Sequence, residues 1–195
     1  MSVLINYFPM ITREQAYQLL QQHIQGRFMI NHHLGAEIVM RAFARHFGEN
    51  EELWGICGLL HDMDWEYTKD NPEEHTKKAA EILRAEGVDE VIIHAVQAHH
   101  PSASGIEPSN LMEQCLYTTE ELTGLMIACA LVQPDKKLAS VTDSSVLKKL
   151  KTKGFARGVN RDIVNQAPEV LGLPMEDVIH ISLEAMQSIA QELGL

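Results

Sequence analysis

The residues of this sequence that are best suited to chemistry are its ten histidines and the carboxylates that stand beside some of them. The densest group lies in residues 57–66, CGLLHDMDWE, where an apolar run ends on His61 and Asp62 and is followed at once by Asp64 and Glu66. Imidazole and carboxylate ligands suit iron, manganese, zinc or nickel rather than a metal that thiolates select. This group is therefore either half of a metal site or an ordinary helix end on a charged surface.

Ligands of one shared metal must converge inside a protein, so the informative histidines are those on apolar helix faces. Residues 29–47 repeat apolar side chains at three- and four-residue steps, and His32 falls on that stripe with His33 one residue round. In the next such stripe, Gly55 and Gly58 predict the close approach of a neighbouring helix. Burying many polar groups without compensation is costly, and a metal ion removes most of that cost. The ligand-type side chains on the apolar stripes of five segments are His32, His61, His75, His99 with the adjacent His100, and Glu120.

Helix signals dominate the segments that must position these side chains. Thr12 and Gln15 have the spacing of a capping box, and Asn71-Pro72 predicts the start of a helix that runs through HTKKAAEILRAEG. Alternating, strand-like runs are scarce, and no Asn-Gly or Asp-Gly hairpin turn occurs. The sequence therefore predicts one all-α, bundle-like domain over residues 1–195.

Composition excludes several classes of function. The net charge of −11 argues against general affinity for nucleic acid or for an anionic membrane. No apolar run approaches the roughly 18 residues of a membrane helix, and the apolar start, interrupted by Asn6 and Pro9, is not read as a signal peptide. Three cysteines at no metal-like spacing indicate buried free thiols of a cytoplasmic protein. A homodimer stays open, because core and exposed apolar surface cannot be separated in an all-helical sequence.

One local segment is basic although the chain as a whole is acidic. Residues 136–161 hold eight lysines and arginines and only one acidic residue, Asp143. Such a segment is suited to the phosphate of a small molecule, with arginine binding in a bidentate manner. The alternative is a solvated helix face and loop. The candidate phosphate-binding residues of this segment are Lys136, Lys137, Arg157 and Arg161.

The ordered set of His32, His61-Asp62, His75, His99-His100 and an acid at 120 resembles the HD-domain superfamily of metal-dependent phosphohydrolases. The resemblance covers residues 28 to 190 approximately. The segments LWGICGLLHDMDWE, PEEHTKKAAEILRAEG and ELTGLMIACALVQPDKKL are similar to a compact group of bacterial and archaeal HD proteins. It implies a single HD-type helical domain with its core at about 28–131, on which the helices of 135–195 pack.

The resemblance also implies a set of metal ligands. A first divalent ion would be held by His32, with His33 as the alternative, together with His61, Asp62 and Glu120, at a position where the family normally has aspartate. A second ion, where present, would be held by His75 and His99, perhaps joined by His100, with Asp62 bridging both ions.

The resemblance implies a phosphohydrolase that acts on a small phosphorylated metabolite or nucleotide through a metal-activated water. Asp62 and Asp64 are the catalytic candidates, and Asp64 or Glu66 could serve as acid or base, although an acidic helix exit exposed to water is the plainer interpretation. Two other functions stay open. One is a di-iron oxygenase on the same fold, and the other is a degenerate, non-catalytic ligand-binding domain, which the glutamate at 120 would suit.

Overall fold

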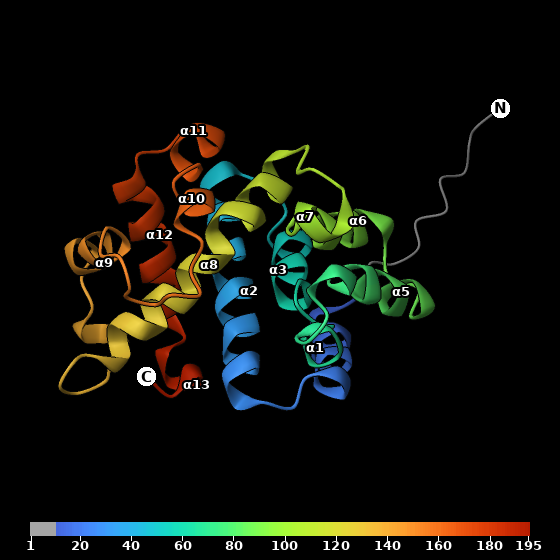
Figure 1. The fold of residues 1–195 in the computed structure, drawn as a ribbon, viewed down its shortest axis with the longest axis horizontal. Coiled ribbons are helices and arrows are strands. Elements are labelled where there is room, and N and C mark those ends of the chain that lie inside the picture. Colours follow the sequence, from blue (N-terminus) through green and yellow to red (C-terminus); the bar gives the residue numbers. More distant parts are fainter. Residues whose placement is uncertain (1–10) are drawn as a thin grey trace.

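The computed structural model describes residues 11–195, and within that range the chain is all-helical, as the sequence predicts (Figure 1). The interpretation of the apolar N-terminal start falls on residues 1–10 and lies outside the described residues. None of the helices in the described part of the chain is long and apolar enough to cross a membrane. The helices of the first half are α1 (Arg13–His23), α2 (Arg27–Phe47), α3 (Glu51–Leu60), α4 (Trp65–Thr68), α5 (Lys77–Ala85) and α6 (Glu90–Ala98). Those of the second half are α7 (Pro101–Ser104), α8 (Leu111–Leu131), α9 (Asp143–Leu150), α10 (Arg161–Val164), α11 (Ala167–Leu171), α12 (Met175–Ser188) and α13 (Ala190–Leu193), with short 3-10 turns at Pro72–Glu74 and Leu138–Ser140.

The α1 helix begins where the sequence predicts. Thr12 accepts a hydrogen bond from the Gln15 backbone, and the Gln15 side chain accepts one from the Thr12 backbone, which completes the capping box.

The helix predicted to start at Asn71-Pro72 is interrupted, and this expectation is corrected. Pro72–Glu74 form one 3-10 turn, and α5 begins only at Lys77, after Thr76 adopts a φ of 65°. In a continuous helix the Ala79 amide would donate to the carbonyl of His75. It donates instead to Asp64 Oδ2 at 3.0 Å. The Asp64 side chain therefore takes the place of the His75 carbonyl as the acceptor of this hydrogen bond.

Two long helices carry the centre of the fold. α2 and α3 pack side by side, and α8 crosses against both, with α12 on the far side of α2 (Figure 1). The closest approach is at Gly58, where a Cβ atom would lie 2.6 Å from the carbonyl oxygen of Ala36 in α2. The predicted close helix contact is therefore confirmed, and it brings the end of α3 against the middle of α2.

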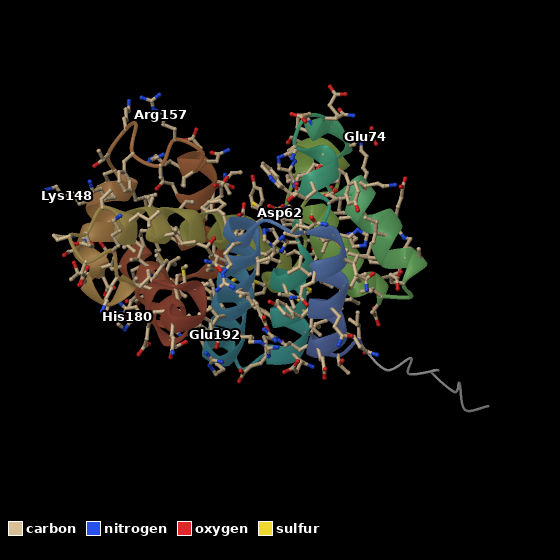
Figure 2. The ribbon with its side chains drawn as sticks, turned by 90° about the horizontal axis from the view of Figure 1, so that it is seen from below. Asp62, Glu74, Lys148, Arg157, His180 and Glu192 are labelled. Atoms are coloured by element: carbon tan, nitrogen blue, oxygen red, sulfur yellow. The ribbon has the colours of Figure 1, made fainter. Side chains whose placement is uncertain are left out.

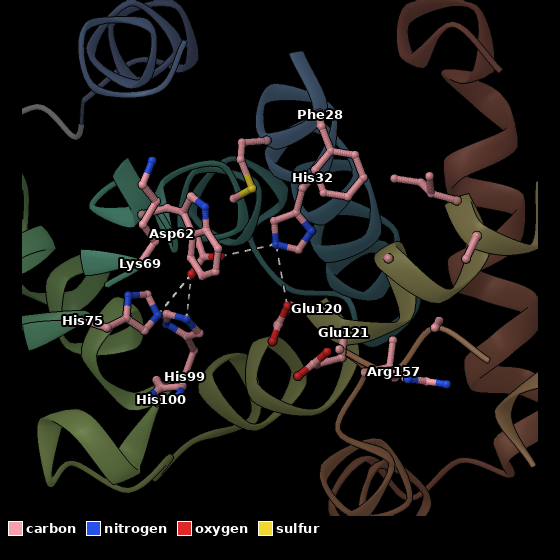
Figure 3. A pocket seen from close by; sticks show the side chains of 18 of the residues that line it. Phe28, His32, Asp62, Lys69, His75, His99, His100, Glu120, Glu121 and Arg157 are labelled. Carbon is pink, nitrogen blue, oxygen red and sulfur yellow. Dashed lines mark hydrogen bonds and ion pairs between the residues drawn. The ribbon is translucent and has the colours of Figure 1, made fainter. Parts of the chain in front are cut away.

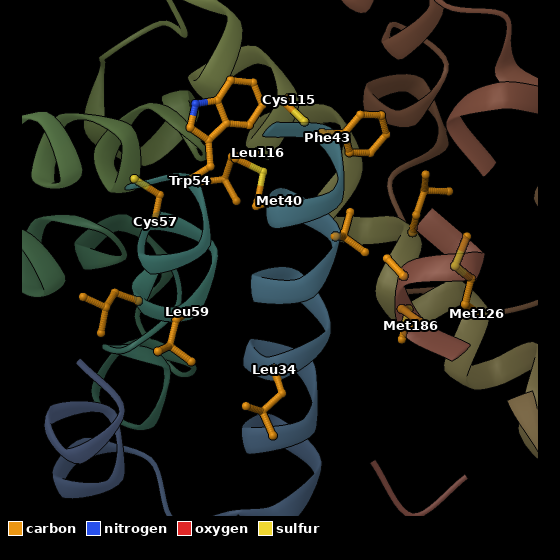
Figure 4. Packing of buried hydrophobic residues seen from close by; sticks show 14 of the residues in the cluster. Leu34, Met40, Phe43, Trp54, Cys57, Leu59, Cys115, Leu116, Met126 and Met186 are labelled. Carbon is orange, nitrogen blue, oxygen red and sulfur yellow. The ribbon is translucent and has the colours of Figure 1, made fainter. Parts of the chain in front are cut away.

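One continuous cluster of buried apolar side chains joins these helices (Figure 4). Phe43 of α2 and Leu116 of α8 are fully buried in it, together with Trp54 of α3. Met186 of α12 belongs to the same cluster, and its Cε atom would be 3.3 Å from a Cβ added at Gly35. The C-terminal helices thus share the core of the 28–131 region and hold α2 and α8 in place from one side.

Candidate metal centre

The polar groups gather where α3 ends, between α2 and α8 (Figure 3). His32 comes from α2, His61 and Asp62 from the end of α3, and Glu120 from the middle of α8. The ligand atoms of His32, His61 and Glu120 lie within 4.8 Å of one another, and so do those of His61, Asp62 and His99. On each helix the polar side chain lies on the apolar face, and these faces meet around Asp62.

Asp62 stands at the centre of the group and faces two pairs of imidazoles. Its Oδ2 atom lies 3.6 Å from His32 Nε2 and 3.7 Å from His61 Nε2. Its Oδ1 atom lies 3.2 Å from His75 Nε2 and 3.2 Å from His99 Nε2. Each carboxylate oxygen therefore has its own pair of nitrogen ligands, which is the arrangement expected of a carboxylate shared between two ions.

The other ring nitrogens of these histidines are occupied, which assigns their protons. Nδ1–H of His61 donates to the Gly58 carbonyl at 2.8 Å, and Nδ1–H of His99 donates to the Val96 carbonyl at 2.6 Å. His32 Nδ1–H donates to Thr123 Oγ1 at 3.0 Å, because the Thr123 hydroxyl is itself committed to the Glu120 carbonyl. Whenever one of these three rings is neutral, its Nε2 atom carries the lone pair, and that lone pair points into the group.

This assignment tests whether the residues suit a cation. His32 Nε2 and His61 Nε2 are 3.0 Å apart, and two lone pairs at that distance cannot form a hydrogen bond with each other. Asp62 and Glu120 add carboxylate oxygens to the same place, with Glu120 Oε2 at 3.7 Å from His32 Nε2. A divalent cation satisfies all of these acceptors at once, so the donor set fits a metal ion.

The local electrostatics favours the protonation states of His61 and Asp62 that can bind a metal ion. Burial lowers the pKa of His61 well below its usual range, so the ring is neutral and its lone pair is available. Burial alone would raise the pKa of Asp62, but the facing histidines hold it well below its usual range. Against its own burial, Asp62 and Asp64 raise the pKa of His75 to about 10, so without a metal this ring carries a second proton and faces Asp62 as a cation. Burial raises the pKa of Glu120 well above its usual range, with Glu121 and Asp62 adding to the effect.

His33, the alternative first ligand, is placed elsewhere. It is fully buried, and its Nδ1–H donates to the Leu59 carbonyl at 2.9 Å. Burial lowers its pKa to about 3. His33 is absent from the cavity lining and from the ligand groups, whereas His32 belongs to both.

Asp64 has a different position from the one expected of a catalytic acid or base. Its side chain is 0% exposed, and both oxygens are engaged. Oδ1 accepts from His75 Nδ1–H at 2.9 Å, and Oδ2 accepts from the Ala79 amide. Asp64 therefore orients His75 rather than contacting a substrate, while Glu66 pairs at the surface with Lys69 at 3.2 Å.

His100 occupies the rim of the group. It lines the cavity, and its ring centroid is 5.0 Å from that of His75. Its Nδ1 atom is 3.4 Å from Ser102 Oγ rather than near a carboxylate.

The four basic candidates from 136–161 separate into two groups. Arg157 lines the cavity, whereas Lys136 and Lys137 are exposed and outside it. The guanidinium of Arg161 donates to five backbone carbonyls, among them those of Leu150 and Phe155. Arg161 thus organises the 151–160 loop that carries Arg157, instead of facing a substrate. Figure 2 shows Asp62 between the part of the molecule with Arg157 and Lys148 and the part with Glu74.

The candidate ligands other than His61 line a cavity of about 580 Å³. Sequence reasoning missed Lys69 and Glu121, both of which line it. Lys69 comes one helical turn after Trp65 in the segment that follows His61-Asp62, and that spacing was the available signal. Glu121 offers no signal of its own, because it is simply the neighbour of Glu120. The size is that of an ordinary small-molecule site.

Comparison with known proteins agrees with this arrangement. Residues 29–132, more than half of the chain, match the HD domain family. Over 83 residues the chain is 32% identical to ribonuclease Y of Thermosipho melanesiensis, an alignment that covers 43% of this chain and only 16% of that protein. No solved structure matches. Since the matched segment spans more than half of the chain and contains His32, His61-Asp62 and Glu120, this chain belongs to the HD domain family.

Proposed function

We propose that this protein is a metal-dependent phosphohydrolase that acts on a small phosphorylated metabolite or nucleotide. The observation that carries the proposal is Asp62, whose two oxygens each face a pair of imidazole Nε2 atoms at one end of a cavity. HD domains are typically metal-dependent phosphohydrolases, and this donor set suits that chemistry.

The residues divide into two sets of ligands. His32, His61, Glu120 and Asp62 Oδ2 would hold one divalent ion, and His75, His99 and Asp62 Oδ1 would hold another. Bound there, the metal supplies a Lewis acid that acidifies a water molecule and polarises a phosphoryl oxygen.

The remaining polar lining residues suit the other needs of the reaction. Lys69 and Arg157 place cationic groups on the cavity wall, where they would bind phosphate oxygens. Burial raises the pKa of Glu121, so this carboxyl retains its proton at higher pH than an exposed glutamate. We assign it the role of giving a proton to the departing oxygen of the ester.

The test is elemental analysis of the purified protein combined with a panel of phosphate esters. The protein is stripped with a chelator and reloaded with iron, manganese, zinc or nickel in turn. Replacing Asp62 by Asn is expected to remove most of the bound metal and the hydrolysis together. His180→Ala is the matched control, since His180 is a surface histidine paired with Asp143. Full metal content and activity in Asp62→Asn would overturn the assignment.

Other outcomes point to the other two functions. Two irons with redox-sensitive spectra and no phosphatase turnover would favour an oxygenase, and failure to bind any of the four metals would favour a non-catalytic ligand-binding domain. RNA belongs in the panel because the similar protein is named a ribonuclease. The net charge of −11 argues against RNA as the substrate.

A further inference from the structure

The cavity continues well beyond the metal ligands, along one face of α8. The lining residues of this helix recur at three- and four-residue steps from Glu120 through Gly124 and Ile127 to Leu131. From Glu120 to Leu131 there are eleven helical rises, which together span about 16 Å. The cavity is therefore elongated, with the carboxylates at one end of the α8 face and Leu131 at the other.

The far end of the cavity is apolar. Phe28 is 64% exposed and Leu131 is 49% exposed, although both are large hydrophobic side chains. Large apolar side chains that line a cavity while remaining exposed mark a place where a ligand supplies the missing contact. Sugar hydroxyls would lose their water here without gaining a side-chain partner. The apolar side chains of the lining are Phe28 and Met29, one turn before His32 on α2, and Ile127, Ala128, Leu131 and Val159 farther from the carboxylates.

Two glycines keep the two ends connected. Gly124 in α8 and Gly158 in the 151–160 loop both line the cavity, and a Cβ atom at either position would meet no atom within 4 Å. Neither neighbouring packing nor a positive φ requires glycine at these positions. Glycine within a helix is less favourable than alanine. Glycine at 124 therefore lowers the stability of α8 and leaves open space in the cavity. Such a cost is expected where a ligand occupies that space.

The polar end would bind phosphate through metal held at Asp62. Lys69 also lines the cavity, and its amine pairs with Glu66 at 3.2 Å. A molecule that fills the whole cavity must therefore carry its anionic group near Asp62 and an apolar body that extends past Gly124 toward Leu131.

We propose that the substrate is a phosphomonoester of an elongated apolar alcohol, such as an alkyl or isoprenyl phosphate, whose hydrocarbon lies along α8. This inference rests on the proposed phosphohydrolase function. In the reaction a water oxygen forms the new bond to phosphorus as the bond to the ester oxygen breaks. The products are inorganic phosphate and the alcohol, which takes one proton.

The test is a homologous series of alkyl phosphates, from ethyl to decyl, hydrolysed by the metal-loaded protein. The value of kcat/KM is expected to rise about fourfold for each added methylene until the cavity is filled, which corresponds to about 0.8 kcal/mol per buried CH₂. Glucose 6-phosphate and AMP serve as polar comparisons and are expected to be poorer substrates than octyl phosphate.

Two variants locate the effect. Gly124→Leu is expected to reduce the gain in kcat/KM per added methylene, because the new side chain occupies the open space in front of α8. The metal content of this variant is measured beside its activity, because residue 124 is one helical turn from Glu120. Leu131→Ser is expected to weaken the dependence for the longest chains. Val132→Ser is the matched control, since Val132 is 57% exposed and does not line the cavity.

The outcomes separate this inference from the proposed function. Hydrolysis of ethyl phosphate with no gain along the series would overturn the inference and leave the phosphohydrolase intact. If no ester is hydrolysed, the proposed function fails. In that case calorimetric titration of the same metal-loaded protein with alkylphosphonates still decides the inference. Affinity that rises with chain length, and does so less in Gly124→Leu, supports it, and affinity independent of chain length overturns it.

Discussion

Asp64 accepts a hydrogen bond from His75, with 2.9 Å between Oδ1 and Nδ1. The other oxygen of the same carboxylate caps α5 through the Ala79 amide. One fully buried side chain therefore both orients an imidazole whose Nε2 atom faces Asp62 and replaces the first hydrogen bond of a helix. Thr76, between the two partners, has a positive φ that is unusual for a β-branched residue. The backbone turn at Thr76 and the two hydrogen bonds of Asp64 together fix the position of His75.

This contact predicts that Asp64→Asn weakens metal binding without removing a ligand. Asparagine retains one oxygen, so it cannot accept from both His75 and Ala79. Losing such an outer contact of a metal-binding histidine typically costs 10–100-fold in metal affinity. The affinity for the ion that His75 would hold, measured by titration calorimetry, should fall by about this factor. Glu66→Gln, two residues on at the surface, should leave the affinity unchanged, and an equal loss in both variants would contradict the role of Asp64.

The neighbouring acids Glu120 and Glu121 should separate metal binding from turnover. Glu120→Gln is expected to lower the metal content, because Glu120 supplies a carboxylate to the His32–His61 group. Glu120→Asp should weaken binding as well, since the shorter side chain starts from the same position on α8. Glu121→Gln should keep the metal and lower kcat. Elemental analysis beside turnover measurements decides this, and loss of metal in Glu121→Gln alone would reverse the two roles.

Two glycine-to-alanine changes should have opposite effects on stability. A Cβ atom at Gly58 would lie 2.6 Å from the Ala36 carbonyl oxygen, and backbone there cannot move cheaply. Gly58→Ala should lower the free energy of unfolding by about 1–3 kcal/mol or more. Gly124→Ala meets open space and should raise it by about 0.5–1 kcal/mol through helix propensity. Chemical denaturation measures both, and a stable Gly58→Ala would show that α2 and α3 are further apart.

Glu113 should make the free energy of unfolding fall as the pH is lowered into the acid range. It is 2% exposed and holds the start of α8, accepting from His94 Nδ1 at 2.7 Å and from the Ser109 amide at 2.8 Å. Burial would raise the pKa of this carboxyl, but those hydrogen bonds hold it below its usual range.

A depressed folded-state pKa contributes stability that is fully present above the unfolded-state pKa, about 4.3 for glutamate, and is lost as pH falls through the folded-state value. Glu113→Gln should therefore cost about 1–3 kcal/mol at pH 7. The difference from the unmodified protein should shrink below about pH 4.3. Glu184→Gln, an exposed residue of α12, is the control. A difference that stays constant from pH 7 to pH 3 would contradict the assignment.

The cysteines should be unreactive in the folded protein. Cys57 and Cys115 are fully buried, and burial raises the pKa of both thiols. Burial also raises the pKa of Cys129 to about 11. A thiol reagent at pH 8 is expected to modify none of the three until denaturant is added, after which all three react. Rapid modification of one thiol in the native protein would show that its helix opens locally.

The sequence predicted the helical class, and it indicated most of the side chains that the structure brings together at Asp62, because both depend on short-range periodicity. His32, His61 and Glu120 could be found as polar side chains on apolar stripes, and each stripe is defined within one helix. The choice between His32 and His33 depends on the residues that surround each of them in the fold, because adjacent residues of one helix face different neighbouring elements. His33 meets the Leu59 carbonyl, and His32 meets the ligand group.

Other assignments depended on contacts between segments far apart in the chain. Asp64 and Arg161 were interpreted as site residues because acids and arginines near a motif suit catalysis and phosphate binding. In the fold, Asp64 is committed to α5 and Arg161 to the carbonyls of its own loop. A local sequence pattern cannot indicate these hydrogen bonds. Whether such a side chain is structural depends on whether the fold places unpaired backbone groups next to it.

The sequence by itself therefore determined the fold class, which follows from residue type and helical spacing. Its motifs also carried the family resemblance, which implied the main candidate ligands. Only the tertiary structure decided how the ligands divide between the two oxygens of Asp62, and that the cavity runs from them along α8 to Leu131. The physical reason is that a cavity is the volume left between packed elements. Its shape depends on how α2, α8 and the 151–160 loop meet, and no single segment of the chain encodes that meeting.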